Sequence, residues 1–278
     1  MKMQAFLEPG KEAAEKQKLY VGCISWTYPD WNGPFYPSGA RSSEFLGLYS
    51  RIFDLVEVDS SFYRTPSSNA VKQWKERTPP NFKFTVKLPK RISHEAKLQK
   101  IEKELEYFEN TILGLEEKLA CVFVQLPPSS KFDSDFAKLE SFLDKANPAL
   151  RYAFEFRNKS WLVDETYNLL GKKNCCLVWG IGEHVDILPK IATDFVYLRF
   201  MGDFNEFQKF DRIQKDKTEI LQKWWEYLRG SMDKLTSAFV LVSNHFAGFA
   251  PESANQFRKY AGLSEVNWRD FFSRTGQP

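Results

Sequence analysis

The segment ACVFVQLPPSS, residues 120–130, decides the fold. Four apolar residues, Cys121–Val124, precede Gln125 and the double proline Pro127-Pro128. A short continuous apolar run of this kind is typical of a strand that is buried on both faces, as in parallel sheets. The prolines end the strand because neither can donate a backbone hydrogen bond to a neighbour. The segment therefore predicts a buried strand that ends in one polar side chain and a stiff turn.

The same pattern recurs along the chain, and segments with apolar residues at three- and four-residue spacing separate the repeats. The eight segments that we expect to form strands are Leu19–Ser25, Leu55–Asp59, Phe82–Leu88, Cys121–Gln125, Arg151–Phe156, Cys175–Gly180, Phe195–Phe200 and Ala238–Ser243. The helices that we expect are Glu44–Phe53, Asn69–Arg77, Ile101–Leu119, Asp135–Ala146, Asp164–Lys173, Thr218–Lys234 and Pro251–Tyr260.

Strands that alternate with helices predict parallel pairing, and eight such repeats predict a closed (β/α)8 TIM-like barrel. The alternative is a doubly wound open sheet, but no GxGxxG fingerprint follows the first strand. No linker or shift in composition divides the chain. The prediction is therefore one barrel domain, residues 19–278, after a polar lead-in, residues 1–18.

The composition is that of an ordinary soluble protein, with 43% hydrophobic and 27% charged residues. The net charge is only +3, which argues against a protein that binds nucleic acid or a membrane surface. Aromatic residues reach 16%. They indicate a large aromatic core, and the alternative is that some rings line a pocket for a flat or sugar-like ligand.

The four cysteines have no CxxC spacing, and three of them lie in apolar runs, so buried thiols are favoured over a zinc site or disulfides. Met1–Lys18 carries charges throughout and has no apolar core, so we expect no signal peptide. No apolar run is long enough for a membrane span. These features predict a cytoplasmic protein.

Polar side chains stand at the ends of most predicted strands. Because the active sites of such barrels lie at the carboxyl ends of the strands, these side chains are expected to meet at one mouth. Side chains alternate along a strand, so Glu57 shares a face with Asp59 and lies one layer deeper. The strand-end residues are Trp26, Asp59, Lys87, Gln125, Glu155, Arg157, Arg199 and Asn244.

Two roles are open for the carboxylates Asp59 and Glu155. They are candidates for general acid/base catalysis or metal ligation, or they are ion-paired with the neighbouring cations. The cations Lys87, Arg157 and Arg199 are candidates for a clamp on a phosphate or carboxylate, for which the arginine fork is well suited.

His94 and His245 are candidate proton carriers, with a hydrogen-bonded loop histidine as the alternative for His94. No HxH or HExxH spacing accompanies them, so no metal is predicted. The aromatic residues Trp26, Tyr63 and Trp161 lie in the exit segments and are candidate pocket walls, with packing as the alternative. The residues identify no cofactor.

An ordered series of motifs runs through the predicted strands and the segments that follow them. The motifs are Gly22–Tyr28, Trp31–Pro37, Glu57–Pro66, Thr78-Pro79, Phe82–Lys87, Ser93-His94, Gln125–Pro128, Glu155–Arg157, Ser160-Trp161, Tyr197–Phe200 and Asn244–Phe246. From about Leu19 to Tyr260 the chain resembles, in these motifs, the YecE-like proteins, the family called domain of unknown function 72. This resemblance implies a TIM-like barrel and implies no reaction. One departure is Met201, which stands where the family commonly has His.

The leading functional hypothesis is an enzyme that acts on a small anionic molecule, phosphorylated or carboxylated, at the mouth of the barrel. The first alternative is a non-catalytic metabolite-binding or adaptor protein. The second is a nucleic-acid-processing enzyme, against which the near-neutral charge argues.

Overall fold

The segment around Phe123 forms a central strand of a parallel sheet in the computed structural model, which describes residues 19–181 and 189–274. This strand, β4 (Leu119–Leu126), pairs with β3 (Lys83–Lys87) and β5 (Tyr152–Phe156), and every strand pairing in the described sheet is parallel. The strand order is β6-β5-β4-β3-β2-β1-β9-β8-β7. The other strands are β1 (Leu19–Ile24), β2 (Leu55–Val58), β6 (Cys176–Leu177), β7 (Trp179–Ile181), β8 (Phe195–Phe200) and β9 (Ser237–Val242).

The strand predicted over Cys175–Gly180 is divided in two, so the described sheet has nine strands instead of eight. β6 pairs with β5 and β7 pairs with β8, while Val178 joins the two short strands. The two ends of the strand order are thus connected by the chain itself. The ring is nearly closed, and the predicted TIM-like barrel is confirmed.

Gly180 allows β7 to lie against β8. Its φ of 142° is a conformation that residues with a side chain rarely adopt, and an added Cβ would lie 2.0 Å from the carbonyl oxygen of Arg199. Only glycine therefore fits at the point where the barrel closes beside the strand that carries Arg199.

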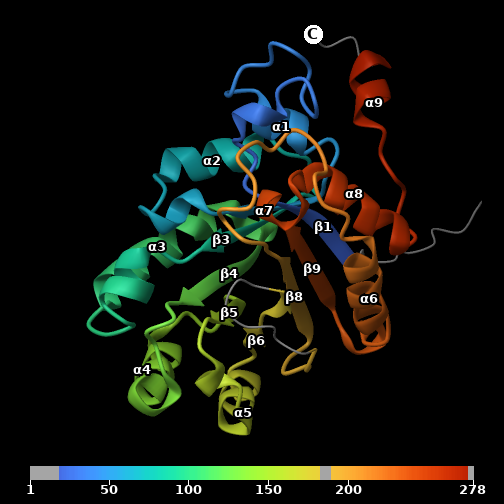
Figure 1. Cartoon of the computed structure of the whole chain (residues 1–278). Coiled ribbons are helices and arrows are strands. Elements are labelled where there is room, and N and C mark those ends of the chain that lie inside the picture. The colour runs from blue at the N-terminus through green and yellow to red at the C-terminus, as the bar shows by residue number, and fades with distance from the viewer. Residues whose placement is uncertain (1–18, 182–188, 275–278) are drawn as a thin grey trace, which may run out of the picture.

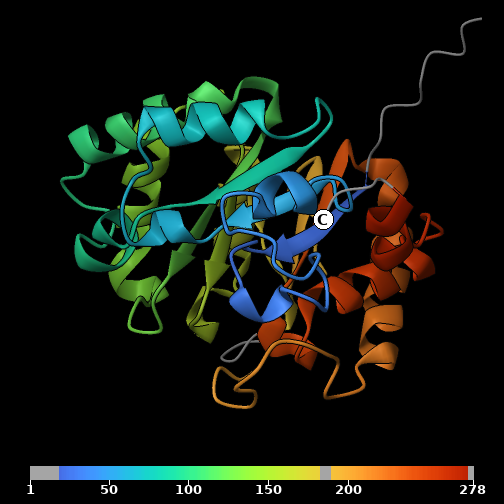
Figure 2. The ribbon, with the colours of Figure 1, turned by 90° about the horizontal axis from the view of Figure 1, so that it is seen from above.

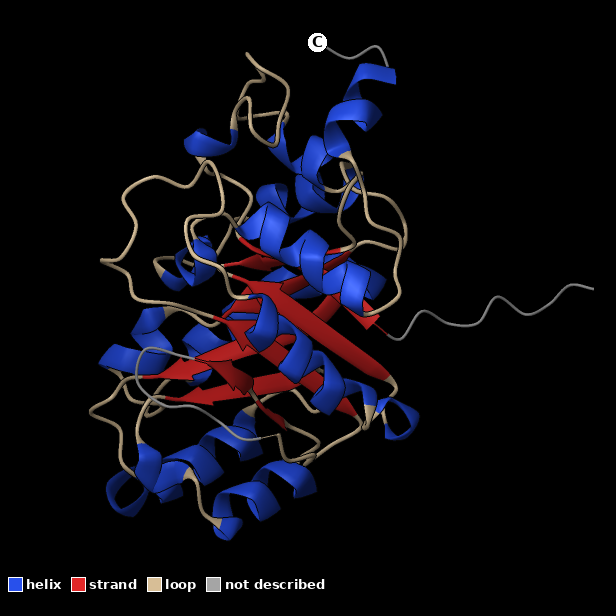
Figure 3. Ribbon diagram, turned by 45° about the vertical axis from the view of Figure 1, so that its right-hand side comes forward, coloured by secondary structure: helices blue, strands red, loops and turns tan. Residues whose placement is uncertain are grey.

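Helices surround the strands, as Figures 1 and 3 show, and Figure 2 gives the view from above. Most follow the expected segments, with ends that differ by one to several residues. The bounds of the helices are α1 (Phe45–Tyr49), α2 (Ser68–Glu76), α3 (Glu102–Ile112), α4 (Phe132–Lys145), α5 (Asp164–Lys172), α6 (Thr218–Arg229), α7 (Asn244–Ala247), α8 (Ala250–Tyr260) and α9 (Trp268–Arg274).

Three features of the helices differ from the expectation, and one is the short helix α7, which lies in a segment that was predicted as a loop. The helix predicted to reach Leu119 ends at Ile112, because Glu116 in the following turn has φ 52° and ψ −129°, which no α-helix accommodates. Helix α9 was not predicted at all. It packs back on the loop after β1, where the indole of Trp268 donates a hydrogen bond to the carbonyl of Pro34 (2.9 Å). In Figure 1, α9 lies near the top, close to the loop that precedes α1.

The alternation of side chains along each strand separates two apolar clusters. Val56 and Val58 of β2 face outward into the layer between sheet and helices, whereas Leu55 faces the barrel interior. The interior cluster also contains Phe123 and Tyr197, whose rings stack with centroids 5.5 Å apart. Each fully buried side chain of this size stabilises the fold by about 1.5–3 kcal/mol.

All four cysteines are buried and free, as predicted. Burial raises the pKa of the Cys23, Cys121, Cys175 and Cys176 thiols, so they remain protonated and act as small apolar side chains. In the described ranges no helix combines the length and apolar character that a membrane span requires.

Candidate functional site

A buried arginine lies at the centre of the polar layer near the carboxyl ends of the strands. Arg199 of β8 donates from Nη2 to Oε1 of Glu57 (2.9 Å) and from Nη1 to Oε2 of Glu155. Its side chain is 3% exposed, and that of Glu57 is fully buried. The face of the Phe123 ring lies 4.1 Å from the guanidinium carbon. One cation thus joins two carboxylates from β2 and β5 across the barrel.

Glu57 has further hydrogen-bond partners inside the barrel. The hydroxyl of Tyr197 donates to its Oε2 (2.6 Å), and the Thr85 hydroxyl lies 2.8 Å from the Tyr197 oxygen. Because the proton of Tyr197 points to the carboxylate, the Thr85 hydroxyl must donate to Tyr197. Burial raises the pKa of Glu57 above its ordinary value, although the charge of Arg199 opposes this rise.

Glu155 is the more strongly acidic of the two carboxylates. Burial alone would raise its pKa, but the guanidinium groups of Arg199 and Arg157 outweigh burial and lower the pKa to about 2. The Gln125 amide donates to Oε1 (2.6 Å), as does Nε of Arg157 (3.3 Å). Glu155 is therefore ionised at neutral pH. It can position its neighbours and stabilise positive charge, but it is poorly suited to deliver a proton.

The predicted cation Lys87 also pairs with a carboxylate, Asp59 at the end of β2 (2.7 Å). The Lys87 ammonium lies 4.4 Å from the centre of the Phe62 ring, and only 10% of its side chain is exposed. The Ser61 hydroxyl lies 2.7 Å from the carbonyl oxygens of Val58 and Lys87 and ties the ends of β2 and β3 together. The alternative reading of the carboxylates, ion pairing, is the arrangement that this structure shows for both Asp59 and Glu155.

His94 lies on a π-helical turn, η3 (Arg91–Glu95), and its ring packs edge-on against Phe62 (4.9 Å). The Ser93 hydroxyl lies 3.2 Å from the Pro89 carbonyl and 2.9 Å from Nδ1 of His94. Since a carbonyl only accepts, Ser93 donates to Pro89, and both contacts are satisfied only if Nδ1–H of His94 donates to Ser93. This tautomer leaves the lone pair on Nε2.

The protonation state of His94 agrees with that tautomer. Burial, aided by the charges of Lys87 and Arg157, lowers its pKa to about 4. The imidazole is therefore neutral at physiological pH, and Nε2 can accept a proton. Short π-helical turns are often found at functional sites. Ser25, at the end of β1, adopts φ 64°, a rare backbone conformation for serine.

Arg157 differs from the other arginine of the mouth. Its side chain is 21% exposed, and its Nε contact with Glu155 is the one hydrogen bond that it makes within the described part of the chain. The two terminal nitrogens therefore remain as donors. Arg157 and His94 are close enough for the arginine charge to lower the pKa of the imidazole.

The structure brings other predicted residues into packing positions. Trp161 is fully buried, stacks on Phe156 (4.5 Å) and donates to the Ser130 carbonyl (3.1 Å), so its ring offers no surface to a ligand in this conformation. Trp26 is 8% exposed and meets Trp74 edge-on (5.8 Å). For these two tryptophans, the structure shows packing, the alternative to a role as pocket walls.

Tyr63 is the exception among the aromatic candidates, because it is 73% exposed beside Phe62 and its ring is available to a ligand.

The residues after β9 hold the first loop in place. Asn244 is completely buried, and its Oδ1 accepts from the Trp31 indole (3.2 Å) and from the Ala250 amide (2.9 Å). The His245 ring packs against Phe204 (4.6 Å) and Phe210 (4.9 Å). Asn244 is thus a structural residue in this conformation, and His245 belongs to an aromatic cluster.

Two members of the polar network, Thr85 and Tyr197, were not identified from the sequence. The signal that points to them is the alternation of side chains, which puts Thr85 on the same face of β3 as Lys87 and Tyr197 on the same face of β8 as Arg199. Met201 is 8% exposed and lies in the interior cluster. Within the described ranges, no three His, Cys, Asp or Glu side chains form a group that could hold a metal ion.

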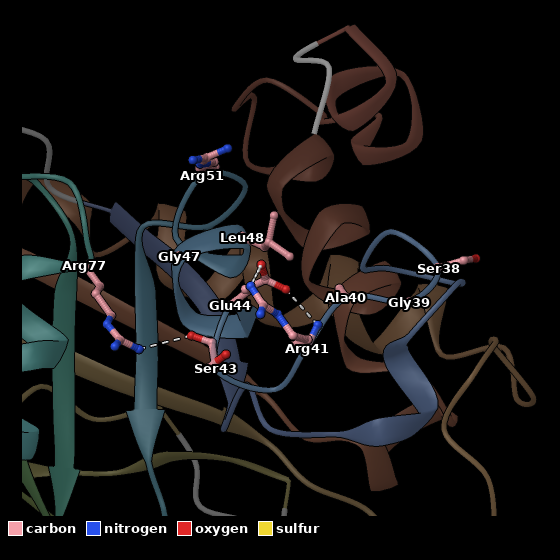
Figure 4. Close-up of a pocket in the computed structure, with 10 residues that line it drawn as sticks. All are labelled: Ser38, Gly39, Ala40, Arg41, Ser43, Glu44, Gly47, Leu48, Arg51 and Arg77. Carbon is pink, nitrogen blue, oxygen red and sulfur yellow. Dashed lines mark hydrogen bonds and ion pairs between the residues drawn. The ribbon is translucent and has the colours of Figure 1, made fainter. Parts of the chain in front are cut away.

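A second basic depression lies on the outer face beside α1, and Figure 4 shows the residues that line its volume of about 550 Å³. Its arginines have partners. Arg41 pairs with Glu44 (3.0 Å), and Arg77 donates to the Ser43 carbonyl (3.1 Å). Because its arginines already have partners, the depression is a weaker candidate for anion binding than the mouth, where the terminal nitrogens of Arg157 remain as donors.

The fold and the mouth together define a parallel α/β barrel with charged residues at its strand ends. The chain belongs to the family described as "Protein of unknown function DUF72", whose sequence model matches residues 20–275. The resemblance to the YecE-like proteins is thereby confirmed.

Proteins similar to this chain come from several bacteria. The UPF0759 protein YunF of Bacillus subtilis (strain 168) is 24% identical over 277 residues, covering 88% of this chain and 97% of that protein. The UPF0759 protein YecE of Escherichia coli (strain K12) is 29% identical over 140 residues, covering 50% of this chain and 48% of that protein. The crystal structure of a DUF72 family protein (TM1631) from Thermotoga maritima has a TM-score of 0.77 and 28% identity, and covers 88% of this chain and 100% of that chain.

Proposed function

We propose that the mouth of the barrel binds a small molecule that carries a phosphate or carboxylate group, and that His94 exchanges a proton with this molecule. The observation that carries the proposal is that Arg157 and His94 both have uncommitted polar groups and lie close enough for the arginine charge to lower the pKa of the imidazole. The terminal nitrogens of Arg157 are uncommitted, and the neutral His94 presents a lone pair on Nε2.

The anion would bind to Arg157 by charge-assisted hydrogen bonds, for which the planar guanidinium fork is well shaped. Lys87 adds positive charge from the neighbouring side of the mouth, although Asp59 partly neutralises it. The ionised Glu155 orients Arg157 through its contact with Nε, and the exposed Tyr63 ring can cover an apolar part of the ligand.

The proton transfer would depend on His94 because the three carboxylates of the mouth are in ion pairs. A base with a pKa of about 4 is a weak base, and a bound anion would raise that pKa by adding negative charge beside the imidazole. Binding of the substrate would therefore strengthen the base that acts on it.

The test separates binding from chemistry. Wild-type protein is screened by thermal shift against sugar phosphates and hydroxy acids, and hits are then assayed for product. Arg157→Ala should weaken binding by roughly 10- to 100-fold. His94→Asn, which can still donate toward Ser93, should retain binding and lower turnover by roughly 100-fold or more. Arg41→Ala, an exposed arginine of the Figure 4 depression, is the matched control and should change neither.

A second candidate function is the binding of an anionic metabolite without reaction. It is favoured by the same ion pairs, which leave no carboxylate of the mouth free for acid/base work. Binding that depends on Arg157, without product from any ligand that binds, would support this candidate. Binding that is unaffected by Arg157→Ala would refute both.

A further inference from the structure

A groove of about 590 Å³ lies between the π-helical turn η3, the start of α3 and the exposed side of α4. Its volume is within the range of small-molecule sites. The lining is mostly polar and comes from three separate elements of the chain. It consists of Arg91, Ala96, Leu98, Gln99, Lys100, Glu102, Ala137, Lys138, Ser141 and Lys145.

The groove is strongly basic. Its lining has four cations and one carboxylate, Glu102, which pairs with Lys145 (2.7 Å). Lys138 pairs with Asp135 beside the groove (2.6 Å). The other two cations, Arg91 and Lys100, are exposed, and the structure shows no ion pair or hydrogen bond for either side chain within the ranges that it describes. An anion in the groove would therefore meet two cations whose charge is not already neutralised.

The loop that carries Lys100 has an unusual backbone. Lys97, Leu98 and Lys100 have φ angles of 47°, 64° and 51°, in the left-handed region that residues other than glycine avoid. The Leu98 side chain is 3% exposed, and its amide donates to the Ile92 carbonyl (3.0 Å), so the core holds the loop in this conformation. Strained backbone that is held by its surroundings is frequent at ligand-binding segments.

The groove is distinct from the mouth of the barrel. Both are built partly from η3, but they use different side chains of this turn. His94 contacts Phe62, and the charge of Lys87 at the mouth lowers its pKa, whereas Arg91 lines the groove. The neutral hydrogen-bonding groups of Ser141 and Gln99 also face the groove. They suit phosphate or carboxylate oxygens, which accept several hydrogen bonds each.

We infer that this groove is a second ligand site, which binds a small polyanion with two or more phosphate or carboxylate groups between Arg91, Lys100 and the lysines of α4. Two groups are expected because each of the two unpaired cations, Arg91 of η3 and Lys100 of the loop before α3, can bind one. The site is independent of the proposed reaction at the mouth.

The experiment uses the full chain and inorganic pyrophosphate, with inorganic phosphate as the shorter ligand. Binding is followed by calorimetry and by the amide NMR shifts of Gln99 and Lys100, with the amides of Ser25 and Ser61 reporting on the mouth. Pyrophosphate should shift the groove amides saturably and bind more tightly than phosphate. The Arg91→Ala/Lys100→Ala double variant should weaken this binding by at least about tenfold.

Two control variants decide whether the effect is specific. Lys223→Ala removes an exposed lysine of α6 and should leave the affinity of the groove unchanged. Arg157→Ala should leave the pyrophosphate-induced shifts of the groove amides unchanged, whatever it does to those of Ser25 and Ser61 at the mouth. The inference is overturned if pyrophosphate causes no saturable shift of the groove amides, if Lys223→Ala weakens binding as much as the double variant, or if Arg157→Ala alone removes the binding. Loss of mouth activity in Arg157→Ala with intact pyrophosphate binding would support it and leaves the two sites separate.

Discussion

Replacement of Arg199 by methionine should strongly destabilise the protein. Methionine fills much of the same space and keeps apolar contact with the Phe123 ring, which lies 4.1 Å from the guanidinium carbon. The change leaves Glu57 as a fully buried carboxylate whose remaining partner is the Tyr197 hydroxyl. Breaking a buried pair by removal of one partner costs about 3–5 kcal/mol. This is a large part of a total stability of roughly 5–15 kcal/mol.

The measurement is urea unfolding at pH 7, followed by tryptophan fluorescence and circular dichroism. The Arg199→Met variant should also show a characteristic pH dependence. Loss of the cation raises the already elevated pKa of Glu57 further, so the folded variant favours the protonated carboxyl. The stability that the variant loses relative to the wild type should be smallest at acidic pH and should grow as the pH rises through the elevated pKa of Glu57.

Two further variants test the reasoning. Glu57→Gln in the Arg199→Met background removes the stranded charge and should recover more than about 1 kcal/mol, as a double-mutant cycle would show. Arg157→Met is the matched control, because its Nε contact of 3.3 Å lies near the surface, and it should cost less than about 1 kcal/mol. The reasoning is refuted if Arg199→Met loses no more stability than Arg157→Met.

Three other predictions concern the same region. Because the folded pKa of Glu155 is about 2 against an ordinary value of 4.5, its ion pairs stabilise the protein by about 3 kcal/mol above pH 4.5. This stabilisation should be lost as the pH falls toward 2, and Glu155→Gln should show a flatter acid limb in urea midpoints. The pKa of His94, about 4, should rise in Arg157→Ala, as an NMR titration of the imidazole would show; an unchanged value would mean that the arginine charge does not act on it. Gly180→Ala should lower the free energy of unfolding by roughly 3 kcal/mol or more, because its Cβ would meet the Arg199 carbonyl at 2.0 Å. Gly39→Ala, with φ 84° and open space around it, should lower it by only about 1 kcal/mol. Equal losses of stability in thermal unfolding would contradict the steric argument.

The strands were predictable because their pattern is local. The apolar run Cys121–Val124 and the two prolines after it define β4 whatever the rest of the chain does, and Phe195–Phe200 was predicted with its observed bounds. The division of the sixth strand was not predictable in this way. It reflects a change of pairing partner, since β6 pairs with β5 and β7 pairs with β8, and these contacts join residues that are distant in sequence. Helix α9 was missed for the same reason, since its place depends on the Trp268 contact with Pro34.

The ring of polar strand ends could be predicted, but not how its charges pair. Strand alternation puts Glu57, Glu155 and Arg199 in the barrel, whereas their partners depend on the register that brings β2, β5 and β8 together across the interior. That register changes the chemistry expected of each residue. Glu155, a candidate acid from its position alone, is ionised and holds its neighbours in place, and the proposed function therefore relies on His94, whose tautomer depends on Ser93 and Pro89. Gln125, which first located the site, holds Glu155 in place for Arg157. The ion pairs within the layer thus leave the terminal nitrogens of Arg157 and Nε2 of His94 uncommitted, and these are the groups that the proposed ligand would meet.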